Sequence, residues 1–288
     1  MKSKVYFCKD VTPEGVLKLY KMLNKDLTGQ VAIKVHSGEE GNPNFLAAEF
    51  WKPVVDFVGG TVVECNTAYK GARHTAEKHR ELFQKHGWSV HFPVDLLDAE
   101  GPDLILEIPQ GNRIQQNYVG KDIANYDGTL VLSHIKGHPS GGFGGALKQL
   151  SIGFASSYGK KYIHGAGSPE NFWTAEKDHF LEAMADAAWS VVNYFKGNAA
   201  YINVMKNLSV DCDCFGANAK LPCMADVGIL ASLDPVAIDQ ACVDLVYNSN
   251  DPGKDEMIER IESRHGLHTL EAAERLGIGS REYELIGV

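Results

Sequence analysis

The chain has 288 residues, of which 44% are hydrophobic and 23% are charged, and its formal net charge at pH 7 is −9. This length can bury one large core or two α/β lobes beside a cleft. The acidic balance argues against duplex nucleic acid and against an anionic membrane as partners, because phosphate binding needs a basic face. A local basic pocket for a small anion stays compatible with it.

The chain also predicts a cytoplasmic protein without a membrane span. Its first residues, Met1–Asp10, contain no hydrophobic region of a signal peptide. Nowhere do about 18 apolar residues follow one another, as a spanning helix requires. In such a context the six cysteines favour free thiols or metal ligands over disulfides.

The first half of the chain alternates between strand and helix patterns. Residues 30–37 alternate apolar and polar side chains and predict a strand. A helix is expected over 45–58, a second strand over 61–65 and a second helix over 73–86, which Gly87 ends. This rhythm predicts a mainly parallel sheet with crossover helices.

The second half continues this α/β pattern less regularly. Between 95 and 127 the clearest strand is 104–108, and a long amphipathic helix is expected over 175–196. The other expected elements are strands at 128–134, 200–205 and 227–231, a helix that begins at Asp234-Pro235, and two helices within 254–276. We interpret 1–288 as a single domain, and any boundary between two lobes is expected within 137–169.

The densest polar motif follows the strand at 128–134. If the backbone stays extended up to Pro139, His134, Lys136 and His138 project to one face, at the strand end where open α/β sheets bind ligands. The backbone amides of the next turn favour an anion, and Lys148 adds positive charge. The glycines of this turn are Gly142, Gly144 and Gly145. The alternative interpretation is a tight turn with solvated histidines.

Two further strand ends carry polar side chains. The first strand leads into Lys34, His36 and Glu39. Because parallel strands end at the same edge of a sheet, these side chains and those of the neighbouring loops are expected to converge on one crevice. The loop after the second strand supplies Asn66, Tyr69, Arg73 and His74.

A second motif contains three cysteines. Cys212 and Cys214 can reach one soft metal, and Cys223 is near enough in sequence to join them. The spacing fits neither a zinc finger nor a ferredoxin run. A complete site would need another ligand, such as an Asp, a His or a further cysteine. The alternative is that these thiols are buried or lie free in a loop.

These motifs leave three functions open. The first is a metal-binding or iron–sulfur redox protein or enzyme, with a redox partner. The second is a metal-independent enzyme on a small carboxylate or phosphate, in which the cationic residues bind the anion and a histidine acts as acid or base. The third is a non-catalytic carrier. The catalytic candidates are His36, His134, His138 and Lys136.

Taken together, the motifs resemble the family called domain of unknown function 362, often labelled iron–sulfur cluster-binding proteins. Many members resembling this chain carry a two-cluster ferredoxin insert after the stretch that matches Gly159 and Lys160. Here residues 161–175 contain no cysteine, so the group of Cys212, Cys214 and Cys223 is the metal or cluster site that the resemblance leaves. The matching stretches are 31–42, 66–74, 134–138, 142–148, 211–216 and 226–239.

Overall fold

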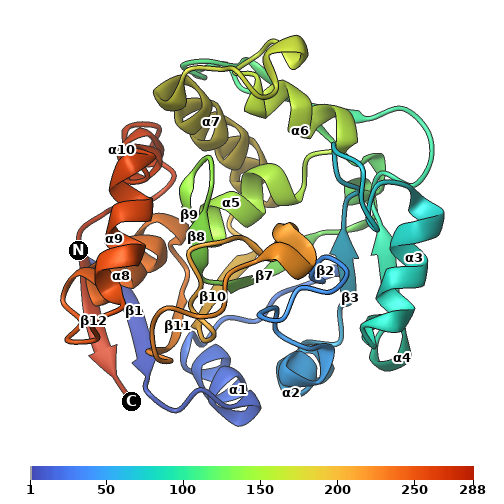
Figure 1. Cartoon of the computed structure of the whole chain (residues 1–288). Coiled ribbons are helices and arrows are strands. Elements are labelled where there is room, and N and C mark those ends of the chain that lie inside the picture. Colours follow the sequence, from blue (N-terminus) through green and yellow to red (C-terminus); the bar gives the residue numbers. More distant parts are fainter. Residues whose placement is uncertain (1) are drawn as a thin grey trace.

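An eight-stranded sheet lies between two layers of helices in the computed structural model, which describes residues 2–288 (Figure 1). The strand order is β12-β1-β11-β10-β7-β2-β3-β4. Strand β11 runs antiparallel to both of its neighbours, and the other five pairs are parallel. The predicted, mainly parallel α/β architecture is therefore confirmed.

The strands of this sheet alternate their side chains between its two faces. In β2, Val31 and Ile33 pack into one hydrophobic cluster, whereas Ala32 between them packs into the other. This period of two produced the strand pattern in the sequence. The strands are β1 (Ser3–Cys8), β2 (Val31–Lys34), β3 (Thr61–Glu64), β4 (Val94–Leu96), β7 (Gly128–His134), β10 (Ala199–Met205), β11 (Gly228–Ser232) and β12 (Tyr283–Gly287).

Helices cover both faces of the sheet. Figure 1 shows α1 and α2 on one side and α5, α7 and α8 on the other, which matches the two hydrophobic clusters. The α-helices are α1 (Pro13–Met22), α2 (Ala48–Val58), α3 (Ala76–Lys85), α4 (Trp88–His91), α5 (Ala146–Lys148), α6 (Ser157–His164), α7 (Lys177–Phe195), α8 (Pro235–Tyr247), α9 (Lys254–Ser263) and α10 (Leu267–Arg275). The short 3₁₀-helices are η1 (Lys121–Asn125), η3 (Pro169–Asn171) and η4 (Asp213–Asn218), and the π-helical turn is η2 (Gln149–Gly153). Among residues 2–288, no helix has both the length and the apolar character needed to cross a membrane.

Two short hairpins lie outside the main sheet. The strand expected at 104–108 is β5 (Leu104–Glu107), which pairs antiparallel with β6 (Gln116–Val119). The segment expected to extend from His134 to Pro139 leaves the sheet after β7. It continues as β8 (Lys136–His138), which forms a hairpin with β9 (Gly142–Gly144).

Some helices begin at local capping signals that hydrophobic periodicity does not reveal. Helix α1 begins with a Thr12 cap, whose hydroxyl accepts a hydrogen bond from the Gly15 amide, followed by proline at the first position. Helix α3 starts at Ala76, three residues later than expected from 73–86, because Thr75 caps it. The helices and strands without a sequence expectation are β1, α1, α4, β4, β6, β9, α6 and β12. The lobe boundary within 137–169 stays a prediction.

Candidate functional site

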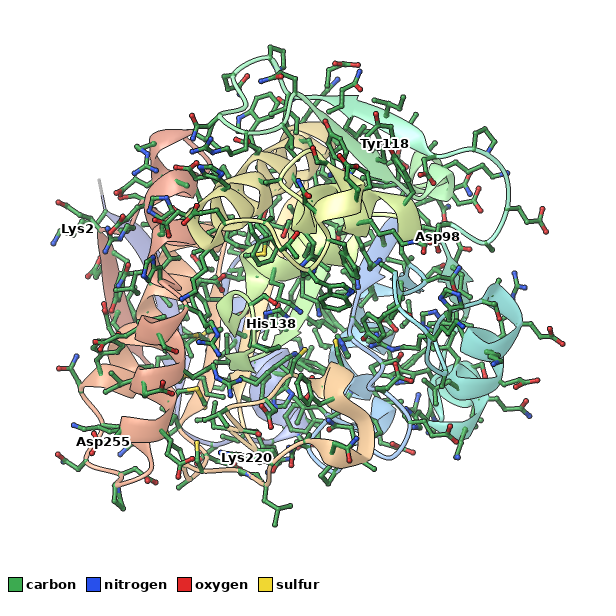
Figure 2. The ribbon with its side chains drawn as sticks, turned by 45° about the horizontal axis from the view of Figure 1, so that its top comes forward. Lys2, Asp98, Tyr118, His138, Lys220 and Asp255 are labelled. Carbon is green, nitrogen blue, oxygen red and sulfur yellow. The ribbon has the colours of Figure 1, made fainter. Side chains whose placement is uncertain are left out.

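A cavity of about 280 Å³ lies at the carboxyl ends of β2, β3 and β7, where open α/β sheets bind ligands. Figure 2 shows His138, one of its lining residues, near the middle of the molecule, whereas Lys2, Lys220 and Asp255 lie at the periphery. The predicted site residues in its wall are Lys34, His36, Tyr69, Arg73, His134, Lys136, His138, Gly144, Gly145, Lys148, Cys212 and Cys214. Three strand ends therefore meet, as the sequence predicted, and the cysteine loop, which was expected as a separate motif, joins them in the same wall.

A histidine and two cysteines form one cluster in this wall. Nε2 of His36, just after β2, lies 3.2 Å from Sγ of Cys214, and that sulfur lies 3.1 Å from Sγ of Cys212. One ligand atom from each residue falls within 4.8 Å of the other two. Imidazole and thiolate are ligands that soft and borderline metals prefer. This group could therefore hold a metal ion.

The two thiols of the cluster have opposite acidities. The thiol of Cys212 donates a hydrogen bond to Cys214, and this bond, helped by His36 and Lys148, holds the pKa of Cys214 well below its usual range despite burial. The same bond, together with burial, raises the pKa of Cys212. The ammonium of Lys148 lies 3.7 Å from Sγ of Cys212. The metal-free cluster thus favours one thiolate, at Cys214, which is the form that binds metals.

Asp213, between the two cysteines, organises the surrounding cations. Its Oδ2 lies 2.8 Å from Nζ of Lys136, 3.0 Å from Nδ1 of His134 and 4.0 Å from Nδ1 of His36. Burial alone would raise its pKa, but His134 and Lys136 lower it. Nδ1 of His36 accepts a hydrogen bond from the Gly38 amide at 3.1 Å, so a neutral ring carries its proton on Nε2, toward Cys214. A metal on Nε2 would require this proton to leave that nitrogen. Asp213 thus positions Lys136 and His134.

The other two histidines differ in what they can still bind. His134 uses both ring nitrogens, Nδ1 toward Asp213 and Nε2 toward the Lys206 carbonyl at 2.6 Å. His138 accepts the Gly141 amide on Nδ1 at 2.9 Å, so a neutral ring carries its proton on Nε2. Burial and the nearby Lys148 hold the pKa of His138 well below the usual value. His138 therefore presents a neutral N–H group in the cavity wall.

A buried network supports the cavity behind β3. Arg73 pairs with Glu39 at 3.3 Å and with Glu64 at 3.4 Å, and it donates to the Tyr69 hydroxyl at 3.3 Å. Burial, with the nearby Cys214, raises the pKa of Tyr69, which keeps the phenol protonated. The predicted Glu39 thus reaches the cavity only through Arg73. Arg73 is itself neutralised inside the protein.

Three of the other predicted ligand-binding residues do not line the cavity within the described chain: Asn66, His74 and Gly142. The Asn66 side chain turns to Asp98, at 3.1 Å, and to His79. Gly142 has a φ of +78° and packs against Gly266, where a Cβ atom would come within 2.8 Å of backbone. The absence of a side chain at Gly142 therefore serves the hairpin rather than the cavity.

The structure also gives the glycine-turn amides a different partner from the one expected. The amides of Ala146 and Leu147 donate to the carboxylate of Asp239 on α8, at 2.8 and 2.9 Å. This carboxylate already occupies the position that we assigned to an external anion. Among the described residues of the turn, the anion expectation is therefore not supported, because an internal anion satisfies these donors.

Cys223 stands apart from the other two cysteines. Its amide donates to the Leu208 carbonyl at 2.8 Å, and its Sγ lies 3.3 Å from the same oxygen. It neither lines the cavity nor belongs to the cluster of His36, Cys212 and Cys214 in the described chain. Backbone pairing of this segment fixes the side chain elsewhere.

The cavity also contains residues that the sequence motifs did not indicate. Lys160 and His164 lie on α6, one helical turn apart on the same face, and both line the cavity. His164 stacks on Phe180 with ring centroids 4.5 Å apart, and burial lowers its pKa to about 3. The i, i+4 spacing of two polar residues within a short helix was the available signal. Gln149, Phe172, Trp173 and Phe215 also line the cavity.

The family model described as "Domain of unknown function (DUF362)" matches residues 31–244. This span covers most of the chain, from β2 to α8, and includes His36, Cys212 and Cys214. The chain belongs to this family. No curated protein matches the chain.

Two solved structures resemble the chain at low sequence identity. One is a crystal structure of a protein from Thermotoga maritima, with a TM-score of 0.44 and 11% identity over 91% of this chain; the chain spans 58% of that protein. The other is the lactate racemase apoprotein from Thermoanaerobacterium thermosaccharolyticum, with a TM-score of 0.44 and 14% identity over 98% of this chain and 82% of the other.

Proposed function

We propose that this protein is a metal-dependent enzyme that acts on a small anionic substrate. A soft divalent metal would bind His36, Cys212 and Cys214. The observation that carries the proposal is the convergence of these three ligand atoms within 4.8 Å of one another in the cavity wall. The proposed ligand set therefore differs from the one expected from the cysteine motif, because His36 takes the place of Cys223.

The number of ligands favours a catalytic over a structural centre. Structural zinc sites are closed by four protein ligands, whereas catalytic sites use three and keep one position for water or substrate. The described cluster offers three ligands and borders a cavity rather than packed core. When bound, the metal would supply Lewis-acid chemistry toward an oxygen of the substrate.

The residues around the cluster suit an anionic substrate. Lys136 and Lys148 place ammonium groups beside Asp213 and Cys212, and Tyr69 adds a protonated hydroxyl. These donors can bind a carboxylate or phosphate oxygen next to the centre. The Nε2–H group of His138 can donate a hydrogen bond to a substrate oxygen or transfer its proton to it.

An iron–sulfur cluster is the competing cofactor. Clusters of ferredoxin type use four cysteines, and the described cluster brings two thiolates together. We therefore propose a single metal ion, and the redox partner implied by a cluster stays a prediction. The two cofactors differ in the iron and sulfide content of the protein and in visible absorbance.

The test is metal analysis of protein purified without oxygen, with Cys212→Ser/Cys214→Ser compared with Cys223→Ser. We expect the parent and Cys223→Ser to retain one metal ion per chain. The double variant should lose it while circular dichroism shows a retained fold. Equal metal in the double variant, or loss in Cys223→Ser alone, contradicts the assigned ligands. Acid-labile sulfide in the parent contradicts the single ion.

A further inference from the structure

Two buried lysines in the cavity wall form no direct ion pair in the described chain, although carboxylates lie near enough to act on them through their charge. Burial lowers the pKa of Lys34 and the charge of Glu64 opposes this shift, whereas burial raises the pKa of Asp103 and the charge of Lys160 opposes that shift. Lys34, at the end of β2, is 1% exposed, and Lys160, on α6, is 8% exposed. Each ammonium donates to a backbone carbonyl, that of Val35 and that of Ala155 respectively. No ion pair is found for either within residues 2–288, although an ammonium carries three donors.

The other strong cations of the cavity contrast with this pair. Lys136 has Asp213 at 2.8 Å, and Arg73 has both Glu39 and Glu64. Lys148 lies beside the thiol cluster. A buried ammonium without an opposite charge in direct contact is costly, so proteins retain one where a ligand supplies that contact or where the chemistry uses it.

The two unpaired lysines approach the same short segment. The Cε atom of Lys34 lies so close to Gly153, at the end of η2, that a Cβ atom there would come within 2.7 Å of it. Lys160 bonds the carbonyl of Ala155, two residues further along. Both side chains line the cavity that also contains the metal cluster. They therefore form a second cationic locus in one cavity.

We propose that the substrate carries two acidic groups. One would lie at the metal centre with Lys136 and Lys148, and the second, a carboxylate or phosphate, would lie between Lys34 and Lys160. This inference rests on the proposed function for the first group and extends it by the second. The substrate class is therefore a dicarboxylic acid or a phosphorylated carboxylic acid.

The test compares succinate and phosphonopropionate with butyrate, which has one acidic group, by calorimetric titration of the metal-loaded protein. Charge-assisted hydrogen bonds predict that one of the two diacids binds at least about tenfold more tightly than butyrate. The diacid that binds more tightly shows whether the second acidic group is a carboxylate or a phosphate-like group. Lys34→Met and Lys160→Met should each remove this advantage, and Lys161→Met, on the same helix but outside the cavity wall, should keep it. A missing preference, or one that survives both substitutions, overturns the inference.

The stability of the ligand-free variants gives an independent readout. Because an unpaired buried ammonium destabilises the fold, Lys34→Met and Lys160→Met should melt above the parent, and Lys161→Met close to it. If both cavity variants melt lower than Lys161→Met, the lysines support the structure and the inference is wrong. Titrating the metal-free Cys212→Ser/Cys214→Ser protein separates the two proposals. If this variant still prefers diacids and the parent protein binds no metal, the proposed metal site is wrong but the inference about Lys34 and Lys160 stands.

Discussion

Asp213 and Asp239 are both buried, at 1% and 0% exposure, yet their acidities shift in opposite directions. Burial disfavours the charge of both. Around Asp213 the charges of His134 and Lys136 overcome burial and lower the pKa. Around Asp239 the neighbours are neutral donors, namely two backbone amides and Asn203, and burial raises the pKa to about 6. The full positive charges near Asp213 thus lower its pKa by more than burial raises it, whereas the neutral hydrogen-bond donors near Asp239 do not offset the effect of burial.

The difference shows how the site divides its work. Asp213 is part of the charged group beside His36, Cys212 and Cys214, where it neutralises Lys136 and orients the His134 ring. Asp239 instead fixes the backbone that carries Lys148 into the cavity, by binding the first amides of α5. One carboxylate balances charge in the cavity wall, and the other holds the backbone of α5 in place.

The largest effect is expected from Asp213→Asn. The change leaves Lys136 buried without its counter-charge, which costs about 3–5 kcal/mol when one partner of a buried pair is removed. Urea unfolding at neutral pH measures this loss. Asp178→Asn is the control, because its pair with His265 is exposed on both sides and should contribute less than about 1 kcal/mol. Equal losses in the two variants would contradict the role given to Asp213.

The second effect is a pH dependence of stability from Asp239. Its pKa is about 6 in the folded protein and near 3.8 when unfolded, so the folded state holds the extra proton between these values. The free energy of unfolding should therefore fall as pH rises from about 4 to about 6, by about 3 kcal/mol for this group. The lowered pKa of Asp213 has the opposite sign: its stabilisation is present above the unfolded pKa and is lost as pH falls.

Asp239→Asn isolates this contribution, because asparagine does not titrate. The difference in unfolding free energy between parent and variant should favour the parent more at about pH 4 than above about pH 6. Urea titrations across this range measure it. A pH-independent difference would show that Asp239 keeps its ordinary acidity in the folded state.

The smallest effect is expected from Gly145→Ala. A Cβ atom at this position would come within 2.3 Å of Oδ1 of Asp239, so the carboxylate must move from the α5 amides. The loss should be about 1–3 kcal/mol, as for overpacking of a core. Gly144→Ala is the matched control, because its Cβ would meet the flexible end of Lys148 at 3.2 Å. Thermal unfolding compares the two, and an equal response would contradict the scaffold role of Asp239.

The sequence predicted the strand ends of the site well. Lys34, His36, Lys136 and His138 follow apolar, alternating strands, and parallel strands must end at a common edge. Local periodicity therefore carried enough information to bring these residues together. The Cys-x-Cys spacing likewise placed Cys212 and Cys214 at one locus, because two residues that close cannot lie far apart.

The remaining partners depend on tertiary contacts that no local pattern encodes. Cys223 is near Cys214 in sequence, but backbone pairing with Leu208 directs it elsewhere. His36 joins the thiols across 178 residues of chain. Asp239 lies on a helix that is buried along most of its length, and only the packing of α8 on α5 shows that its carboxylate binds the first amides of α5.

The wide separation of His36 from the two cysteines constrains the order of assembly. An unfolded or partly folded chain holds Cys212 and Cys214 together but lacks the imidazole, so metal added early would recruit whichever thiol or histidine is nearest. The finished sheet, with β2 beside β7, is needed to bring the proposed third ligand, His36, to the two thiols. Loading after folding should thus give more correctly ligated protein than refolding in the presence of metal.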